Sequence, residues 1–132
     1  WQHTVGELRS AGVRSVGGYE AAALVRHKGF VVVDVRTEDA FAETHARGAV
    51  NVPLFTTRKA AGAAAAVRRA LLSTVGQCPT TENERFADDV AAALPEGAPG
   101  VVLVDDAPRA GASEGTRTRA LMAAARLVPQ GR

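Results

Sequence analysis

The sequence predicts an α/β domain in which a parallel β-sheet carries helices on both faces. Continuous apolar, β-branched runs occur at residues 30–35 (FVVVDV) and 101–104 (VVLV), as expected of strands buried on both sides. Segments with helical patterns alternate with these runs along the chain, which is the order found in βα-type parallel sheets. A length of 132 residues suits a single domain, residues 1–132, with one core.

The first half of the chain predicts helices and strands in alternation. A short helix is expected over residues 19–26 (YEAAALVR), because a Gly-Gly pair precedes it and a Lys-Gly pair follows it. The apolar run at 30–35 is the first strand, and an acidic helix over 38–43 comes after it. A glycine and a proline bracket AVNVP at 49–53, which indicates a second short strand centred on residues 50–52.

The second half predicts two further helices around the strand at 101–104. The first, residues 81–94, opens with a capping box in which Glu84 follows Thr81 by three residues. Its apolar face is expected to contain Phe86, Val90 and Leu94. A Gly/Pro/Ser loop at 107–115 then leads to a last helix, whose apolar side is expected to contain Leu121, Ala124, Ala125 and Val128. Because alanine buries little area, the large core side chains are expected to be Trp1, Phe30, Phe41, Phe55 and Phe86.

The stretch at residues 58–72 (RKAAGAAAAVRRALL) predicts one more helix, with basic residues at both ends. One interpretation is a docking surface for an acidic partner or an anionic membrane face. The interpretation we favour is an ordinary helix that packs alanines on the sheet and keeps its arginines in water. Gly62 and the weak apolar face would make this helix a poor membrane binder.

Composition argues against several functional classes. The formal net charge is only +2 and aromatic residues make up 5%, so nucleic-acid binding is not expected. The single cysteine, Cys78, rules out an intramolecular disulfide and a cysteine-rich metal cluster. The three histidines show no ligand spacing, and neither a metal nor a cofactor is expected. No apolar run approaches the ~18 residues that suggest a transmembrane segment, and the first residues do not resemble a signal peptide.

A set of residues in the first half carries a family resemblance. The segment VGGYEAAALVRHKGFVVVDVRTEDAFAETHARGAVNVPL resembles the N-terminal half of rhodanese domains, with its DVR strand end and its His-x-x-Gly-Ala-x-Asn-x-Pro segment. The residues that fit this pattern in order are Asp34, Val35, Arg36, Phe41, His45, Gly48, Ala49, Asn51 and Pro53. The resemblance implies a rhodanese-like fold and gives Asp34, Arg36, His45, Gly48, Asn51 and Pro53 a scaffold role.

The second half resembles the plant and algal plastid rhodanese-like proteins. In them a long insert, here residues 56–80, precedes a Thr-Glu-Asn segment, seen here as TTENERFADDV. Their active loop leads into a Gly-x-x-(Ser/Thr)-Arg-(Ser/Ala)-Leu motif, which matches the sequence here from Gly115 to Leu121. The resemblance covers residues 12–128. It also implies a closing strand and helix after residue 132, and this sequence does not contain them.

The resemblance places the catalytic cysteine directly after the strand at 101–104, where this chain has Asp105. Sulfur transfer in the family needs a thiolate there, which the loop amides and the next helix N-terminus stabilise. A carboxylate cannot hold a persulfide, so no catalytic residue is assigned. We expect the carboxylate of Asp105 to accept loop N–H bonds or to cap the last helix. The anion-binding loop of the family, called here the anion cradle, would consist of Asp105, Asp106, Ala107 and Arg119.

These features predict a catalytically inactive rhodanese-like module that binds other proteins. The resemblance places it in the chloroplast, in the stroma or at the thylakoid membrane, as part of a protein complex. The candidate partner-contact residues lie in the insert: Arg58, Lys59, Arg68 and Arg69. Two alternatives stay open, namely a sulfurtransferase that uses Cys78 as a relocated nucleophile, and a domain that senses small anions with the loop amides and Arg119.

Overall fold

The central sheet contains three short parallel strands in the order β2-β1-β5. A computed structural model of the chain describes residues 1–57, 67, 71, 80–106 and 118–130. The middle strand β1 (Val31–Asp34) pairs with β2 (Val50–Asn51) and with β5 (Val101–Val104), and both pairings are parallel. The predicted parallel pairing of FVVVDV with VVLV is therefore confirmed.

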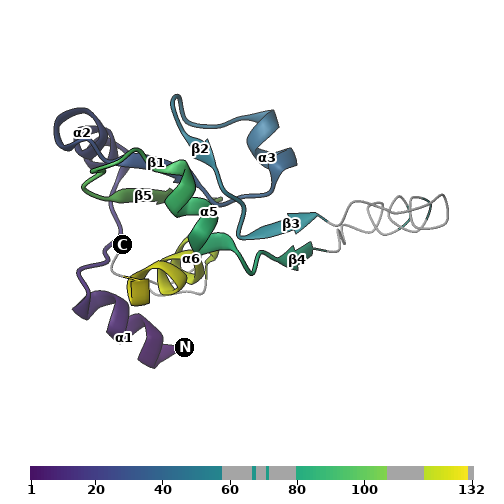
Figure 1. The fold of residues 1–132 in the computed structure, drawn as a ribbon, viewed down its shortest axis with the longest axis horizontal. Coiled ribbons are helices and arrows are strands. Elements are labelled where there is room, and N and C mark those ends of the chain that lie inside the picture. Colours follow the sequence, from purple (N-terminus) through teal and green to yellow (C-terminus); the bar gives the residue numbers. More distant parts are fainter. Residues whose placement is uncertain (58–66, 68–70, 72–79, 107–117, 131–132) are drawn as a thin grey trace.

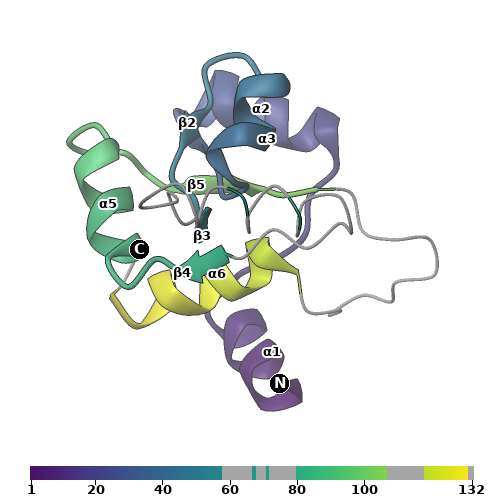
Figure 2. The ribbon, with the colours of Figure 1, turned by 90° about the vertical axis from the view of Figure 1, so that its right-hand side faces the viewer.

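Helices lie on both faces of this sheet, as the sequence predicts. In Figure 2, α2 (Gly18–Lys28) and α3 (Glu38–Glu43) lie above β5, α6 (Arg119–Leu127) lies below it, and α5 (Phe86–Ala93) lies to the left of the strands. A short 3₁₀ turn, Val128–Gln130, follows α6. Helix α2 ends at Gly29, whose φ of 73° is a left-handed cap that favours glycine. The described residues thus form the α/β architecture predicted.

The first helix, α1 (Gln2–Ser10), has no counterpart among the predicted elements. Its buried residues, Val5 and Leu8, lie on the side that packs against α6, and Figure 2 shows α1 beneath α6 on the α5/α6 side of the sheet. Trp1, expected in the core, is 39% exposed. That expectation was wrong, because the buried apolar side chains of this segment belong to α1, which follows Trp1 in the sequence.

A two-stranded hairpin lies beside the main sheet and projects from the body of the domain (Figure 1). Its strands β3 (Phe55–Thr57) and β4 (Thr80–Glu82) pair antiparallel, with Thr56 opposite Thr81. The predicted capping box at Thr81 is therefore wrong, because strand pairing uses the backbone around Thr81. Asn83 begins the turn into α5 instead, since its Oδ1 accepts the Arg85 N–H at 3.0 Å.

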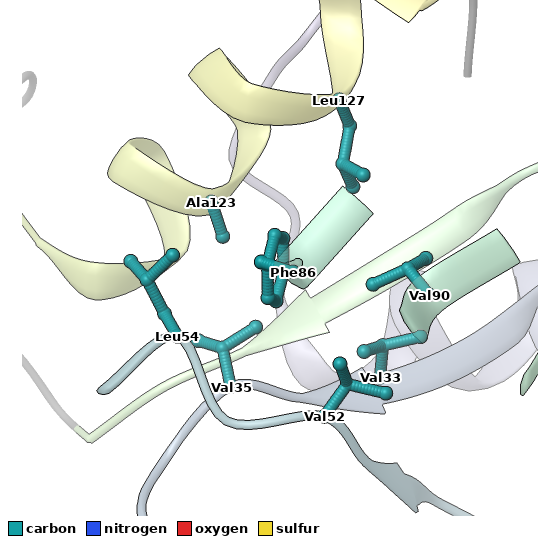
Figure 3. Close-up of a cluster of buried hydrophobic side chains, with 8 residues drawn as sticks. All are labelled: Val33, Val35, Val52, Leu54, Phe86, Val90, Ala123 and Leu127. Atoms are coloured by element: carbon teal, nitrogen blue, oxygen red, sulfur yellow. The ribbon is translucent and has the colours of Figure 1, made fainter. Parts of the chain in front are cut away.

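The core lies between the sheet and the pair α5 and α6. Figure 3 shows its buried apolar side chains pointing toward one another: Val33, Val35, Val52, Leu54, Phe86, Val90, Ala123 and Leu127. Of the four phenylalanines, Phe86 is fully buried, while Phe30, Phe41 and Phe55 are partly buried. The predicted inward positions of Phe86 and Val90 on α5 are confirmed, with Leu94 packed at the edge of the core.

The apolar face of α6 differs from the predicted one. Its buried residues are Ala123, Ala124 and Leu127, whereas Leu121, Ala125 and Val128 are half-buried. Helix α6 packs against β5, α5 and α1. The positions of these three neighbours determine which residues of α6 are buried, and these are not its most apolar residues. The predicted loop at 107–115 lies outside the described residues. So does the predicted helix at 58–72, apart from Val67 and Leu71, which are both helical.

Candidate functional site

The candidate site lies where β1 and β5 end side by side and α6 begins. The carboxyl ends of adjacent parallel strands meet at one edge of a sheet, which is where ligands of open α/β sheets bind. Asp34 is the last residue of β1, Asp105 and Asp106 follow β5 directly, and Arg119 is the first residue of α6. With Arg36, these residues form what we call the charged cluster.

A buried ion pair ties the end of β1 to the loop behind it. The Asp34 side chain is fully buried, and its two oxygens accept hydrogen bonds from Nε of Arg36 at 3.0 and 3.1 Å and from Nη2 at 2.7 Å. Nη2 of Arg36 also donates to the Thr44 carbonyl at 2.6 Å. The hydrogen bonds to Asp34 raise the pKa of the Arg36 guanidinium above its ordinary value. The pair is thus a hydrogen-bonded ion pair of the kind that buried charges require.

The other predicted scaffold residues lie around this pair. Nδ2 of Asn51 donates to the carbonyls of Asp34 and Arg36, both at 3.1 Å, and so holds β2 against the end of β1. The ring of His45 stacks on Phe41, with centroids 3.8 Å apart, and its Nδ1 lies 2.8 Å from the Phe41 carbonyl oxygen. His45 is exposed and lies in the segment between α3 and β2.

Two further scaffold residues act through the backbone. Gly48 has a φ of 79°, a left-handed conformation that glycine adopts without strain in the turn before β2. The Pro53 carbonyl accepts a hydrogen bond from Nδ2 of Asn83 at 3.3 Å. Asn83 also donates to Asp89 at 2.9 Å and thereby joins the base of the hairpin to α5. Asn83 is not among the predicted site residues, although an Asn just before a helical pattern is a recognised N-terminal signal.

The carboxylate of Asp105 is bonded to backbone amides at the start of α6. Oδ1 accepts the N–H of Asp106 at 2.8 Å, and Oδ2 accepts the N–H of Ala120 at 3.1 Å. The Asp105 side chain is 11% exposed. Next to it, Oγ1 of Thr118 accepts the N–H of Leu121 at 3.2 Å. Asp105 and Thr118 therefore satisfy two of the amides that a helix leaves open at its N-terminus.

Asp106 joins the two halves of the charged cluster. Its Oδ2 lies 2.9 Å from Nη1 of Arg119, and its Oδ1 lies 3.7 Å from Nη1 of Arg36. Arg119 also lies 3.6 Å from Oδ1 of Asp105. Asp34 and Arg36 are predicted scaffold residues, and the other three residues are predicted members of the anion cradle. The structure brings both sets together, because β1 and β5 are neighbours in the sheet.

The chemistry of the cluster follows from its composition. Three carboxylates face two guanidinium groups, so its formal charge is −1 when all five groups are ionised. Each group has at least one partner of opposite charge within 4 Å. No group of three or more His, Cys, Asp or Glu side chains that could hold a metal ion occurs among the described residues. The cluster suits charge pairing and helix capping, and it contains no thiol.

Several predicted site residues cannot be placed. Ala107, Cys78 and the four basic residues of the insert lie outside the described residues. Their proposed roles remain predictions. Within the described ranges, no helix is both long and apolar enough to cross a membrane.

Comparison with known proteins identifies the family. The family model for the rhodanese-like domain matches residues 19–110. The chain is also 32% identical over 136 residues to rhodanese-like domain-containing protein 14, chloroplastic, from Arabidopsis thaliana, covering 99% of this chain and 61% of that protein. The chain thus spans less than two thirds of the length of this relative. No solved structure matches the chain significantly. With a matched family model over most of its length and a parallel α/β sheet, this chain belongs to the rhodanese-like domain family.

Proposed function

We propose that this chain is a catalytically inactive rhodanese-like module that acts as a protein-interaction or assembly subunit in the chloroplast. The observation that carries the proposal is the position and the hydrogen bonding of Asp105. It follows β5 directly, in the position where the family resemblance places the nucleophilic cysteine. Its carboxylate is already bonded to the amides of Asp106 and Ala120.

The chemistry of sulfur transfer explains why this arrangement argues against activity. A thiolate attacks the sulfur donor and carries the transferred sulfur as a persulfide, and a carboxylate can do neither. Two backbone amides next to this position, those of Asp106 and Ala120, already donate to the oxygens of Asp105. The cluster also has a formal charge of −1, which opposes the approach of an anionic donor such as thiosulfate.

The hairpin supports an interaction role, because its strands β3 and β4, between which the insert runs in the sequence, project from the body of the domain (Figure 1). Its base is fixed to α5 through Asn83 and to α6 through an ion pair between Glu82 and Arg126. Within the insert, Val67 and Leu71 lie four residues apart in helical backbone, and they are 60% and 64% exposed. Exposed apolar side chains at helical spacing, next to basic residues, suit a protein partner with an apolar and acidic surface.

The proposed location rests on the relative. The Arabidopsis protein is named as chloroplastic, and the insert and loop motifs resemble the plastid branch. Within that organelle, we propose a protein complex in the stroma or at the thylakoid surface. A fluorescent fusion of the full natural chain, followed by fractionation into stroma and thylakoids, tests this location.

The activity test is sulfur transfer by the purified protein from thiosulfate or mercaptopyruvate to cyanide or a thiol. The expected result is no turnover above that of a Cys78→Ala variant. Turnover that Cys78→Ala abolishes would replace this proposal with a sulfurtransferase that uses a relocated nucleophile. An assay of Asp105→Ala under the same conditions is the matched control, because any activity of the carboxylate itself would disappear in that variant.

The interaction test reverses the charge of Arg58, Lys59, Arg68 and Arg69 by changing all four to Glu. Association with partners in a plastid extract, measured by native gel mobility and co-purification, should weaken while the melting temperature stays close to that of the unchanged protein. The control reverses two exposed basic residues of α2, Arg26 and Lys28. A collapse of the melting temperature with unchanged partner binding by the folded fraction would show that the insert packs on the core.

A further inference from the structure

The hairpin strand β4 has an open edge. Among the described residues it pairs with β3 alone, and its residues Thr80 and Thr81 are exposed. Figure 1 shows the hairpin projecting from the body of the domain, away from the central sheet. An exposed edge strand presents N–H and C=O groups that can pair with another strand, and proteins often protect such edges with lysine or proline. The strand β4 contains neither residue.

Two hydrogen bonds show which backbone groups of β4 point outward. The Asn83 N–H donates to the Leu54 carbonyl at 2.8 Å, and the Thr81 carbonyl accepts a threonine hydroxyl of β3 at 3.4 Å. The backbone groups of Asn83 and Thr81 therefore face β3. Because the two directions alternate from one residue to the next in an antiparallel strand, the N–H and C=O groups of Thr80 and Glu82 face away from β3.

We propose that the β4 strands of two copies of this chain pair antiparallel at this edge and join the two hairpins into one sheet. A pairing centred on Thr81 places Thr80 of each copy opposite Glu82 of the other. Both residues direct an N–H and a C=O outward, so each of these two pairs forms two hydrogen bonds. A twofold axis at Thr81 thus satisfies all the outward backbone groups of Thr80 and Glu82, and this self-complementarity is what a symmetric dimer requires.

The ion pair between Glu82 and Arg126 favours this pairing. In the joined sheet, the two Glu82 side chains lie on one face at diagonal positions, which are about 7–8 Å apart. Two unpaired carboxylates at that separation would repel each other. Arg126, on α6, contacts Oε1 of Glu82, and it therefore balances the carboxylate charge on each side of the interface.

The dimer is expected to be weak, because two strands of three residues bury less than the ~1,200 Å² of a stable interface. We expect a dissociation constant on the order of 1 mM. The inference rests on the proposed assembly role and names a second copy of the chain as a partner. The two can fail separately, because the proposed function is tested by turnover and by binding of other proteins, whereas the dimer is tested with the purified chain alone.

Disulfide trapping tests the pairing. The two Thr81 residues would form a non-hydrogen-bonded pair with Cα atoms about 4.5 Å apart, within the range of about 4.4–6.8 Å that a disulfide spans. Thr81→Cys is combined with Cys78→Ala, which removes the native thiol, and the protein is oxidised with diamide. The covalent dimer should form about tenfold faster than with Ala22→Cys in the same background, because pairing holds the two thiols together. Ala22 is an exposed residue of α2 and provides the matched control.

Two further variants test the hydrogen bonds and the charge. Thr80→Pro, added to the Thr81→Cys protein, removes an outward N–H and no bond to β3, and edge strands tolerate proline at such positions. It should slow the cross-link to the control rate and leave the melting temperature little changed. Arg126→Gln leaves the Glu82 carboxylates without their partner and should slow the cross-link about threefold in low salt.

Three results would overturn the proposal. One is a cross-linking rate in Thr81→Cys no higher than in Ala22→Cys, an outcome that does not depend on how the proline variant folds. Another is fast cross-linking that persists in a folded Thr80→Pro variant, because the thiols would then meet without strand pairing. The third is a monomer at every concentration up to about 1 mM in sedimentation equilibrium of the unchanged protein. A dimer that Thr80→Pro abolishes would support the pairing.

Discussion

An Asp–Arg ion pair lies at the end of each of two neighbouring strands, β1 and β5. The two pairs have the same chemistry but differ in how deeply they are buried. At the end of β1, Asp34 and Arg36 are 0% and 13% exposed and share three side-chain hydrogen bonds. After β5, Asp106 and Arg119 are 57% and 38% exposed and share one. The two pairs are linked through the contact between Arg36 and Asp106.

Because the two pairs differ in burial, we expect them to contribute differently to the stability of the fold. Breaking a buried pair leaves a charge without water or a partner, and this strongly lowers the free energy of unfolding. Breaking an exposed pair costs little, because water replaces the lost partner. The buried pair can therefore hold the sheet edge together, whereas the exposed pair can be broken without endangering the fold. The predictions below test this division.

The largest effect is expected from Asp34→Asn. The substitution leaves the Arg36 guanidinium largely buried without its main partner, so the free energy of unfolding should fall by about 3 kcal/mol. Urea denaturation followed by circular dichroism measures the change. Asp88→Asn, at an exposed position of α5, should change it by less than about 0.5 kcal/mol. A loss equally small in Asp34→Asn would mean that the buried pair does not support the fold.

An intermediate effect is expected from Asp105→Ala, because Asp105 belongs to the exposed half of the cluster by position but is nearly buried. The variant loses the acceptor for the Ala120 N–H at the start of α6. The expected destabilisation is about 1 kcal/mol, the usual size of a lost helix cap.

Hydrogen exchange at Ala120 provides the specific readout for Asp105→Ala. Exchange at that amide should become faster than in the unchanged protein. Asp105→Asn keeps one oxygen acceptor and should lose less stability than Asp105→Ala. If both variants retained full protection of the Ala120 amide, the hydrogen bond from that amide to Asp105 would contribute nothing.

A small effect on stability is expected from Asp106→Asn. The pair of Asp106 with Arg119 is well exposed, so the free energy of unfolding should change by no more than about 0.5 kcal/mol. The same urea denaturation applies, in low salt, where exposed ion pairs are least screened. A loss as large as that of Asp34→Asn would mean that the two pairs do not differ as their burial indicates.

The titration of Arg36 itself is expected to have no effect on the free energy of unfolding between pH 7 and pH 10. Its pKa is raised in the folded state by the hydrogen bonds with Asp34. A raised pKa contributes stability that is fully present below the unfolded pKa and is lost only as the pH rises through the folded one, and for arginine both lie far above pH 10. The destabilisation caused by Arg36→Gln should therefore be the same at pH 7 and pH 10. A destabilisation that differs between these two pH values would contradict this account of the pair.

Local patterns were sufficient for much of the fold. The continuous apolar runs identified β1 and β5, and the acidic segment at 38–43 matches α3. Local patterns misled at Thr81, where a good capping sequence takes part in a hairpin with Thr56, 25 residues away. They also missed α1, whose low apolar content gives a weak signal until Val5 and Leu8 pack against α6.

For the site, the sequence by itself determined which groups are present: an aspartate in place of the cysteine after β5, a second aspartate beside it, and an arginine in each half of the chain. These are matters of covalent composition, and the family motifs fix their order. Tertiary structure decided which of them meet. The adjacency of β1 and β5 brings Arg36 to Asp106, and the packing of α6 turns Arg119 and the Ala120 amide toward the Asp106 and Asp105 carboxylates. Such contacts depend on strand order and helix rotation, which arise from burial across the whole core and leave no local signature in the chain.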